Sequence, residues 1–385
     1  IRSSNLSNLR IGGEGTFPGE TISVRTGFRS EFIGIDTRLG GLFQNVETGS
    51  SPTLVQLGLF ATPEIRLLPG NQLQIEPGLR IQYYDSGIHP YLEPRLRIRY
   101  ERTNQVLTLA GGRFHQELLG LNDRRDVASI FTGWKSIGSA PRQLGDVLVG
   151  RAYHGASSYR IGLAPGLELA AGGFYRTYTN LFVQEWSSVP RFATNLQAAN
   201  GRSYGGSVRL EFDREPFYGF LNYGYSNTRY TAATEQFELW YGEEKLSFRP
   251  PHDQRHQVNA VFGFARWGYE LRVRWSGATG RPYSRPLGFD GFVYMNDLEN
   301  QFRTESERRV IYEEPFNATL PPYHRLDVSL QKTLSLSEQV DLTVQGSLIN
   351  AYDRPNIFYL DVFTAQREDQ LPLVPSFGLK LEVGR

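Results

Sequence analysis

The chain has 385 residues, with 41 Lys and Arg against 40 Asp and Glu, and it contains no Cys. The net charge of +1 argues against a nucleic-acid surface, and the lack of Cys excludes thiol catalysis, Cys-bound zinc and disulfides. No run approaches about 18 consecutive apolar residues, which excludes a membrane-spanning helix. The mean hydropathy of −0.40 does not exclude a membrane barrel, because alternating lipid-facing and lumen-facing residues cancel in any average.

Strict alternation of apolar and polar residues runs along the whole chain. In 95–101, Leu, Ile and Tyr alternate with Arg and Glu, and 270–276, 323–334 and 339–348 repeat the pattern. Such alternation predicts strands with one apolar and one polar face, and no apolar stripe with helical spacing competes with it. The fifteen predicted strands are, in chain order, 5–16, 21–40, 53–67, 72–83, 91–102, 105–115, 147–163, 167–180, 204–213, 217–230, 254–265, 269–277, 323–334, 339–350 and 374–384.

The connections between these strands alternate between short and long. Short ones carry turn residues, as in FPGE (17–20) and LPGN (68–71). A soluble β-sandwich or propeller gives no reason for this segregation, whereas outer-membrane barrels have short periplasmic turns and long extracellular loops. The predicted fold class is therefore all-β, a transmembrane antiparallel β-barrel. The long connections are 41–52, 84–90, 116–146, 181–203, 231–253, 278–322 and 351–373.

The predicted number of strands is odd. Because the last strand follows a long loop and therefore ends in the periplasm, an odd number of strands means that the first one begins outside the cell. Bacterial barrels have an even number of strands and both termini in the periplasm. We therefore expect residues 1–385 to form one barrel domain, in which either one strand is missing from this count or the chain is the C-terminal piece of a larger barrel. The opening IRSSNLSNLR has neither Met nor signal peptide, which indicates a processed or truncated start.

Several segments, in order and spacing, resemble TonB-dependent outer-membrane receptors. They cover most of residues 53–384, although the chain ends LEVGR where the family usually ends in an aromatic residue. The resemblance implies that these strands are the C-terminal portion of a barrel of about 22 strands, with the plug domain and first strands outside this sequence. The segments are LQIEPGLRIQYYDSGIHPYLEPRLRIRY (73–100), LTLAGGRFHQ (107–116), 160–182, YGGSVRLEF (204–212), DQRHQVNAVFGF (253–264), ATGRPYS (278–284), YHRLDVSLQKTL (323–334) and LINAYDRPNIF (348–358).

The resemblance also implies a function in the bacterial outer membrane. It implies active import of a scarce solute, such as a metal chelate, oligosaccharide or peptide, driven through the TonB–ExbB–ExbD system. The implied partners are outer-membrane lipid and the plug domain, and a surface lipoprotein or larger membrane complex is a further one. The residues alone also allow a passive porin-like channel of about 14 or 16 strands, or a barrel scaffold within a cell-surface complex.

No enzymatic activity, cofactor or resident metal is predicted. His154 near Ser157 would suit a hydrolase, but no third, orienting group is identifiable. His252, Asp253 and His256 could suggest a metal site, yet the similarity to the DQRH strand start of the family favours a structural role, with the Arg and Asp paired.

Two sets of residues are predicted to matter for function. The charged residues of the polar faces should face the lumen or a plug: Arg95, Arg97, Arg99, Arg209, Glu211, Glu270, Arg272, Arg274, Arg325 and Asp327. Aromatic residues of the long loops could contact a ligand or partner: Trp134, Trp186, Trp240, Tyr241, Phe289 and Tyr294. The loop 278–322 is expected to contain local hairpin structure, and Val273 and Leu342 are expected to face lipid near mid-membrane.

Overall fold

The computed structural model describes residues 2–40, 45–46, 51–84, 89–121, 126–128, 133–136, 149–184, 186, 196–291, 308–361 and 366–383. Its main element is a 17-stranded antiparallel sheet. Two members are short, β3 (Asn45–Val46) and β15 (Lys245–Phe248). The other fifteen are β1 (Arg2–Phe17), β2 (Ile22–Gly40), β4 (Ser51–Leu67), β5 (Leu73–Tyr84), β6 (Tyr91–Arg102), β7 (Gln105–Gln116), β11 (Gly150–Ala164), β12 (Leu167–Gln184), β13 (Leu196–Arg214), β14 (Phe217–Ala233), β16 (His256–Arg266), β17 (Tyr269–Ala278), β22 (Tyr323–Ser337), β23 (Val340–Ile349) and β26 (Val374–Val383).

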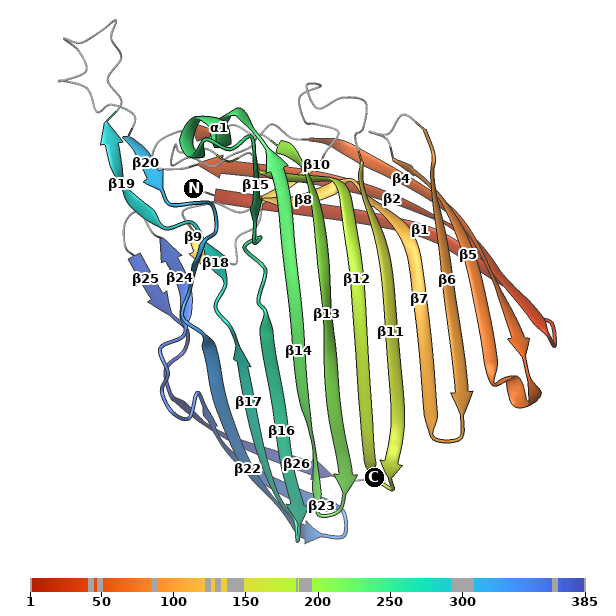
Figure 1. Ribbon diagram of the computed structural model, residues 1–385. Coiled ribbons are helices and arrows are strands. Elements are labelled where there is room, and N and C mark those ends of the chain that lie inside the picture. Colours follow the sequence, from red (N-terminus) through yellow and green to blue (C-terminus); the bar gives the residue numbers. More distant parts are fainter. Residues whose placement is uncertain are drawn as a thin grey trace, which may run out of the picture.

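These fifteen strands match the fifteen predicted ones, and the all-β barrel wall is confirmed. Each long strand pairs with the next one along the chain, from β1 with β2 to β23 with β26. Figure 1 shows the tight turns at one end of a curved sheet and the longer connections at the other. Within the described residues, β1 pairs only with β2 and β26 only with β23.

Some predicted boundaries are wrong at the long-connection end. β13 begins at Leu196, not at 204, and β12 continues to Gln184. Residues 196–203 (LQAANGRS) carry small and polar side chains without clear alternation. Ala199 is nevertheless buried against the loops, so tertiary packing extends this strand where local pattern does not.

The long connections contain further short elements. Helix α1 (Glu235–Tyr241) departs from the purely β expectation. A single 3-10 turn, η1 (Pro69–Asn71), lies instead in the short connection between β4 and β5. No described helix is long and apolar enough to cross a membrane. Short strands pair as β8 (Leu118–Leu121) with β10 (Gly133–Ser136), β18 (Pro282–Tyr283) with β21 (Ala318–Thr319), β19 (Pro286–Gly291) with β20 (Arg308–Tyr312), and β24 (Ile357–Asp361) with both β25 (Gln366–Asp369) and β9 (Asp126–Ala128).

The register gives the wall two chemically different faces. Side chains alternate along each strand, so residues that are register partners share a face. We call the face that carries Arg97, Arg272 and Asp327 the polar face. The opposite, apolar face carries large hydrophobic side chains that are exposed, among them Leu96 (44%), Phe262 (42%) and Leu330 (50%).

Candidate functional site: a basic cavity on the polar face

All ten charged residues singled out in the strands lie on the polar face. Arg97 of β6 is the register partner of Glu76 in β5, and Arg272 of β17 is the register partner of Ser329 in β22. The strand-to-strand register between β5 and β22 keeps all such partners on the same face of the wall. Most of these residues form ion pairs, and the partners usually stand two positions apart in the same strand. Arg209 pairs with Glu211 at 2.8 Å, and Arg272 pairs with Glu270 at 2.6 Å. The further pairs are Arg95–Glu93, Arg97–Glu76, Arg99–Glu101 and Arg325–Asp327.

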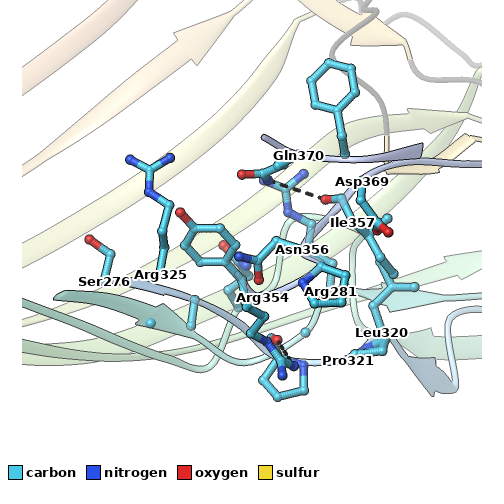
Figure 2. A pocket seen from close by; sticks show the side chains of 18 of the residues that line it. Ser276, Arg281, Leu320, Pro321, Arg325, Arg354, Asn356, Ile357, Asp369 and Gln370 are labelled. Atoms are coloured by element: carbon cyan, nitrogen blue, oxygen red, sulfur yellow. Dashed lines mark hydrogen bonds between the residues drawn. The ribbon is translucent and has the colours of Figure 1, made fainter. Parts of the chain in front are cut away.

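A cavity of about 790 Å³ opens on this face near the long-connection end; we call it the rim cavity. Residues of β16, β17 and β22 form its floor, and the segments around Arg281, Leu320 and Arg354 form its sides. Figure 2 shows Arg325 on one side of the cavity, Asp369 on the other, and Arg354 and Arg281 between them. This volume lies within the range of about 300–1,000 Å³ typical of small-molecule sites.

The turn after β23 holds Arg354 in place. Asn350, which is 1% exposed, donates from Nδ2 to the Arg354 carbonyl oxygen (3.0 Å) and accepts from the Arg354 amide at Oδ1 (3.1 Å). Its own amide donates to Asp327 (3.0 Å), and its φ of 54° is left-handed, a conformation that Asn tolerates better than most residues. The segment LINAYDRPNIF therefore encodes a rigid turn beside the cavity.

The rim cavity carries an excess of positive charge. Arg325 pairs with Asp327 at 2.9 Å, and the lining carboxylate Asp369 pairs with Arg367 at 2.8 Å. Arg281 has no ion pair with any described carboxylate, and the buried Nε of Arg354 has no hydrogen-bond partner within the described part of the chain. Because guanidinium groups bind carboxylates and phosphates bidentately, the cavity is suited to an anionic group. Leu320, Ile357, Phe358 and Leu371 add an apolar side.

Three of the six predicted loop aromatic residues, Trp186, Trp240 and Tyr241, belong to a separate aromatic cluster. Trp186 (4% exposed) packs with Phe237, Tyr241 and Tyr312 at ring-centroid distances of 5.3–6.0 Å. Trp240 packs against this cluster, and the Tyr241 hydroxyl donates to the Glu313 carbonyl oxygen at 3.1 Å. Three long connections are thereby joined into one small core. This packing role accounts for Trp186 without a ligand.

The other predicted loop aromatic residues are dispersed. Trp134 packs on Ile33, Ile35 and Leu54, which brings the β8–β10 hairpin onto the polar face. Phe289 lies in β19 opposite Val310. Tyr294 lies outside the described residues.

The predicted pairing of Arg and Asp at the start of β16 is present. The buried carboxylate of Asp253 contacts Arg249 at 2.8 Å and Arg255 at 3.7 Å. His252 and His256 contact different tyrosines, Tyr230 at 3.4 Å and Tyr223 at 2.8 Å. The protein packed around the His252 ring lowers the pKa of its imidazole, and Asp253 opposes this shift. The two rings therefore hold neighbouring strands instead of converging on one point.

The His154–Ser157 pair does not form. The two residues are three positions apart in β11, so their side chains point to opposite faces of the wall. The His154 ring instead packs against Phe114, with ring centroids 4.7 Å apart. A hydrolase mechanism through this pair is excluded.

Several lining residues of the rim cavity were missed by sequence reasoning. Arg281 and Arg354 lie within ATGRPYS and LINAYDRPNIF, two segments that carry the family resemblance, so a signal existed. Asp369 and Gln370 come from the last long connection, and no local motif marks them. The hairpin of β24 and β25 brings them to the cavity.

Comparisons with known proteins define the class of fold. No protein-family model matches the chain, and no curated protein matches its sequence. Solved structures match over nearly the whole chain, and the three described below are receptors for ferric enterobactin, for a siderophore and for pyoverdine. At identities of 15% or less these matches show the fold, which agrees with the fold of the receptors that the motifs resemble.

Three of these structures are a point mutant of the ferric enterobactin receptor PfeA from Pseudomonas aeruginosa, the siderophore receptor PirA from Acinetobacter baumannii, and the pyoverdine outer-membrane receptor FpvA from P. aeruginosa PAO1 bound to pyoverdine. Sequence identities are 15%, 11% and 10%, and TM-scores are 0.61, 0.58 and 0.58. The matches cover 99%, 99% and 98% of this chain but 54%, 55% and 52% of those chains. The chain thus spans about half the length of these receptors.

Proposed function

We propose that the protein is part of an active transporter in the bacterial outer membrane. The observation that carries this proposal is the wall itself: fifteen long strands with an exposed apolar face and a charged polar face, in the arrangement of siderophore-receptor barrels. The apolar face meets lipid, and the polar face encloses the lumen. The wall forms the C-terminal portion of a barrel of about 22 strands that holds a plug domain.

In this proposal the solute binds from outside and crosses when TonB rearranges the plug. The rim cavity lies at the end of the long connections, which strand parity places outside the cell, and it would take the solute first. Among a metal chelate, an oligosaccharide and a peptide, the chelate is favoured. The ligands named for the matching receptors are ferric enterobactin and pyoverdine, and the excess Arg suits an anionic chelate.

Uptake in cells tests the proposal. Cells that express the complete native gene receive radio-iron chelates, with and without TonB and with and without a collapsed proton gradient. We expect uptake that stops when either is removed, while diffusion of a small sugar through general porins continues. Chelate uptake that persists without TonB would indicate a passive channel instead.

A further inference from the structure

A second cavity lies deeper on the polar face, away from the rim cavity. It has a volume of about 500 Å³ and is formed by β1, β2, β4 to β7 and β11. Five arginines line it against two glutamates: Arg25, Arg29, Arg80, Arg95 and Arg97, with Glu14 and Glu76. Its residues run along the middle part of these strands, from Glu14 and Arg25 near a short turn to Phe114 and His154 nearer the long connections, and we call it the lumen cavity.

The available carboxylates do not neutralise this cavity. Glu76 pairs with Arg97 at 3.2 Å, Glu93 pairs with Arg95 at 2.8 Å, and Glu14 is 3.9 Å from Arg25. Arg29 and Arg80 form no ion pair with a carboxylate in the described ranges. Two guanidinium groups therefore remain without a counter-ion on one stretch of wall.

Two buried nitrogen atoms at this cavity also have no partner. Within the described residues, neither Arg80 Nε nor His154 Nε2 has a hydrogen-bond partner. Buried polar atoms in folded proteins are nearly always paired with protein or water, so an unpaired atom at a cavity needs an explanation. A bound oxyanion would supply acceptors to the Arg80 guanidinium and, when Nε2 carries the proton, to the His154 ring.

Gly58 leaves room on the polar face for the Arg80 side chain. Gly58 is the register partner of Arg29 in β2. A Cβ on Gly58 would lie 2.7 Å from Gln82 Oε1, 2.9 Å from Arg80 Nη2 and 3.0 Å from Arg80 Nε, so the Gln82 amide and the Arg80 guanidinium both lie over the bare glycine. Arg29 and Arg80 both line the cavity, and an oxyanion bound there would offset their positive charge.

We propose that the lumen cavity is an anion-binding site for a solute that carries carboxylate or phosphate groups, held by Arg29 and Arg80 with His154 at its edge. The site is distinct from the rim cavity, and both lie on the same face of the wall. That the anion is cargo on its way through the lumen rests on the proposed transport function; its binding does not.

Calorimetric titration of the purified protein in detergent tests the site, with citrate and inorganic phosphate as probes. The Arg281→Gln/Arg354→Gln variant is the background, because it removes the two rim-cavity arginines that have no ion pair with a described carboxylate. In this background we expect binding of at least one probe that weakens with added salt. Adding Arg29→Gln/Arg80→Gln should lower the affinity at least tenfold, while Arg29→Lys/Arg80→Lys should retain part of it.

The control for folding is heat-modifiable migration on gels, which should be the same for every variant. If a variant does not fold, Gly58→Ala in the same background displaces the Arg80 guanidinium together with the Gln82 amide and should also weaken binding. Absence of citrate and phosphate binding in the background protein, or unchanged affinity after Arg29→Gln/Arg80→Gln, would overturn the proposal. Because no TonB is present in this experiment, its result is independent of the uptake test.

Discussion

The buried carboxylate of Asp253 holds the start of β16 in place. It accepts from the Thr228 amide at 3.0 Å and from Arg249 Nε at 2.8 Å. Asp253→Ala leaves these donors without an acceptor, and breaking a buried ion pair from one side costs about 3 kcal/mol. We expect a lower unfolding midpoint in urea and faster hydrogen exchange at the Thr228 amide. Glu338→Gln, in the exposed turn before β23, is the control, and equal effects of the two changes would contradict this role.

Val273 tests the apolar face at one position. It lies in the middle of β17, opposite Phe262 and Val328. Val273→Lys should destabilise the wall by about 2–4 kcal/mol in lipid bilayers, because it places a charge near the midplane. Ser347→Lys is a matched control on the polar face, next to the register partner of Val328, and should cost far less. Similar unfolding free energies for the two variants would show that Val273 does not face lipid.

Leu342, expected near mid-membrane like Val273, lies nearer to a short turn than Val273 does. It is the third residue of β23, directly after a short turn, and it pairs with Leu334 and Leu381 near that end of the sheet. A charge at this position should cost less than one at Val273, because the penalty falls toward the membrane interface. Unfolding of Leu342→Lys in the same bilayers measures this difference, and an equal or larger loss than for Val273→Lys would contradict the assigned depth.

At the scale of elements, the aromatic cluster joins three long connections outside the wall. Phe237 of α1 is 1% exposed and packs with Trp186, and Phe248 stacks on Phe316 at 5.4 Å. Phe237→Ala leaves a cavity that should cost about 3 kcal/mol of loop packing. We expect limited proteolysis to cut within α1 and the loop before β13 while the wall stays protected. An unchanged cleavage pattern would contradict the coupling of the loops.

The β19–β20 hairpin supports the expected local structure of the loop 278–322. Its outer part can be removed by deleting residues 287–310, which leaves Tyr312 in the aromatic cluster. We expect the shortened protein to fold and its chelate uptake or partner binding to fall, because this loop stands beside the mouth of the rim cavity through Arg281 and Leu320. Wild-type uptake and wild-type partner binding together, with an intact wall, would leave this loop only a shielding role.

Alternation predicted the strands of the wall well, because successive side chains of a strand point to opposite faces. Where one face is apolar and the other polar, the sequence alternates with a period of two residues. The polar-face positions of Arg97, Arg272 and Asp327 follow from that period alone. The rim cavity could not be predicted in the same way, because Asp369 and Gln370 reach it through the β24–β25 hairpin and Arg354 through the left-handed turn at Asn350. The unpaired state of Arg29 and Arg80 also depends on which carboxylates the register brings near, which no local motif encodes.

Across the whole molecule, one face of the wall should contact lipid and the other should enclose a polar lumen. The chain has no Cys, so single Cys substitutions carry spin labels at unique positions. Labels at Val273 and Leu330 report on the apolar face, and labels at Arg97 and Asp327 report on the polar face. Their collision rates with oxygen, which concentrates in lipid, and with a water-soluble nickel chelate are measured in bilayers. We predict high oxygen and low nickel accessibility at 273 and 330, and the reverse at 97 and 327. Lipid-like accessibility at 97 and 327 would contradict the assignment of these positions to a polar lumen.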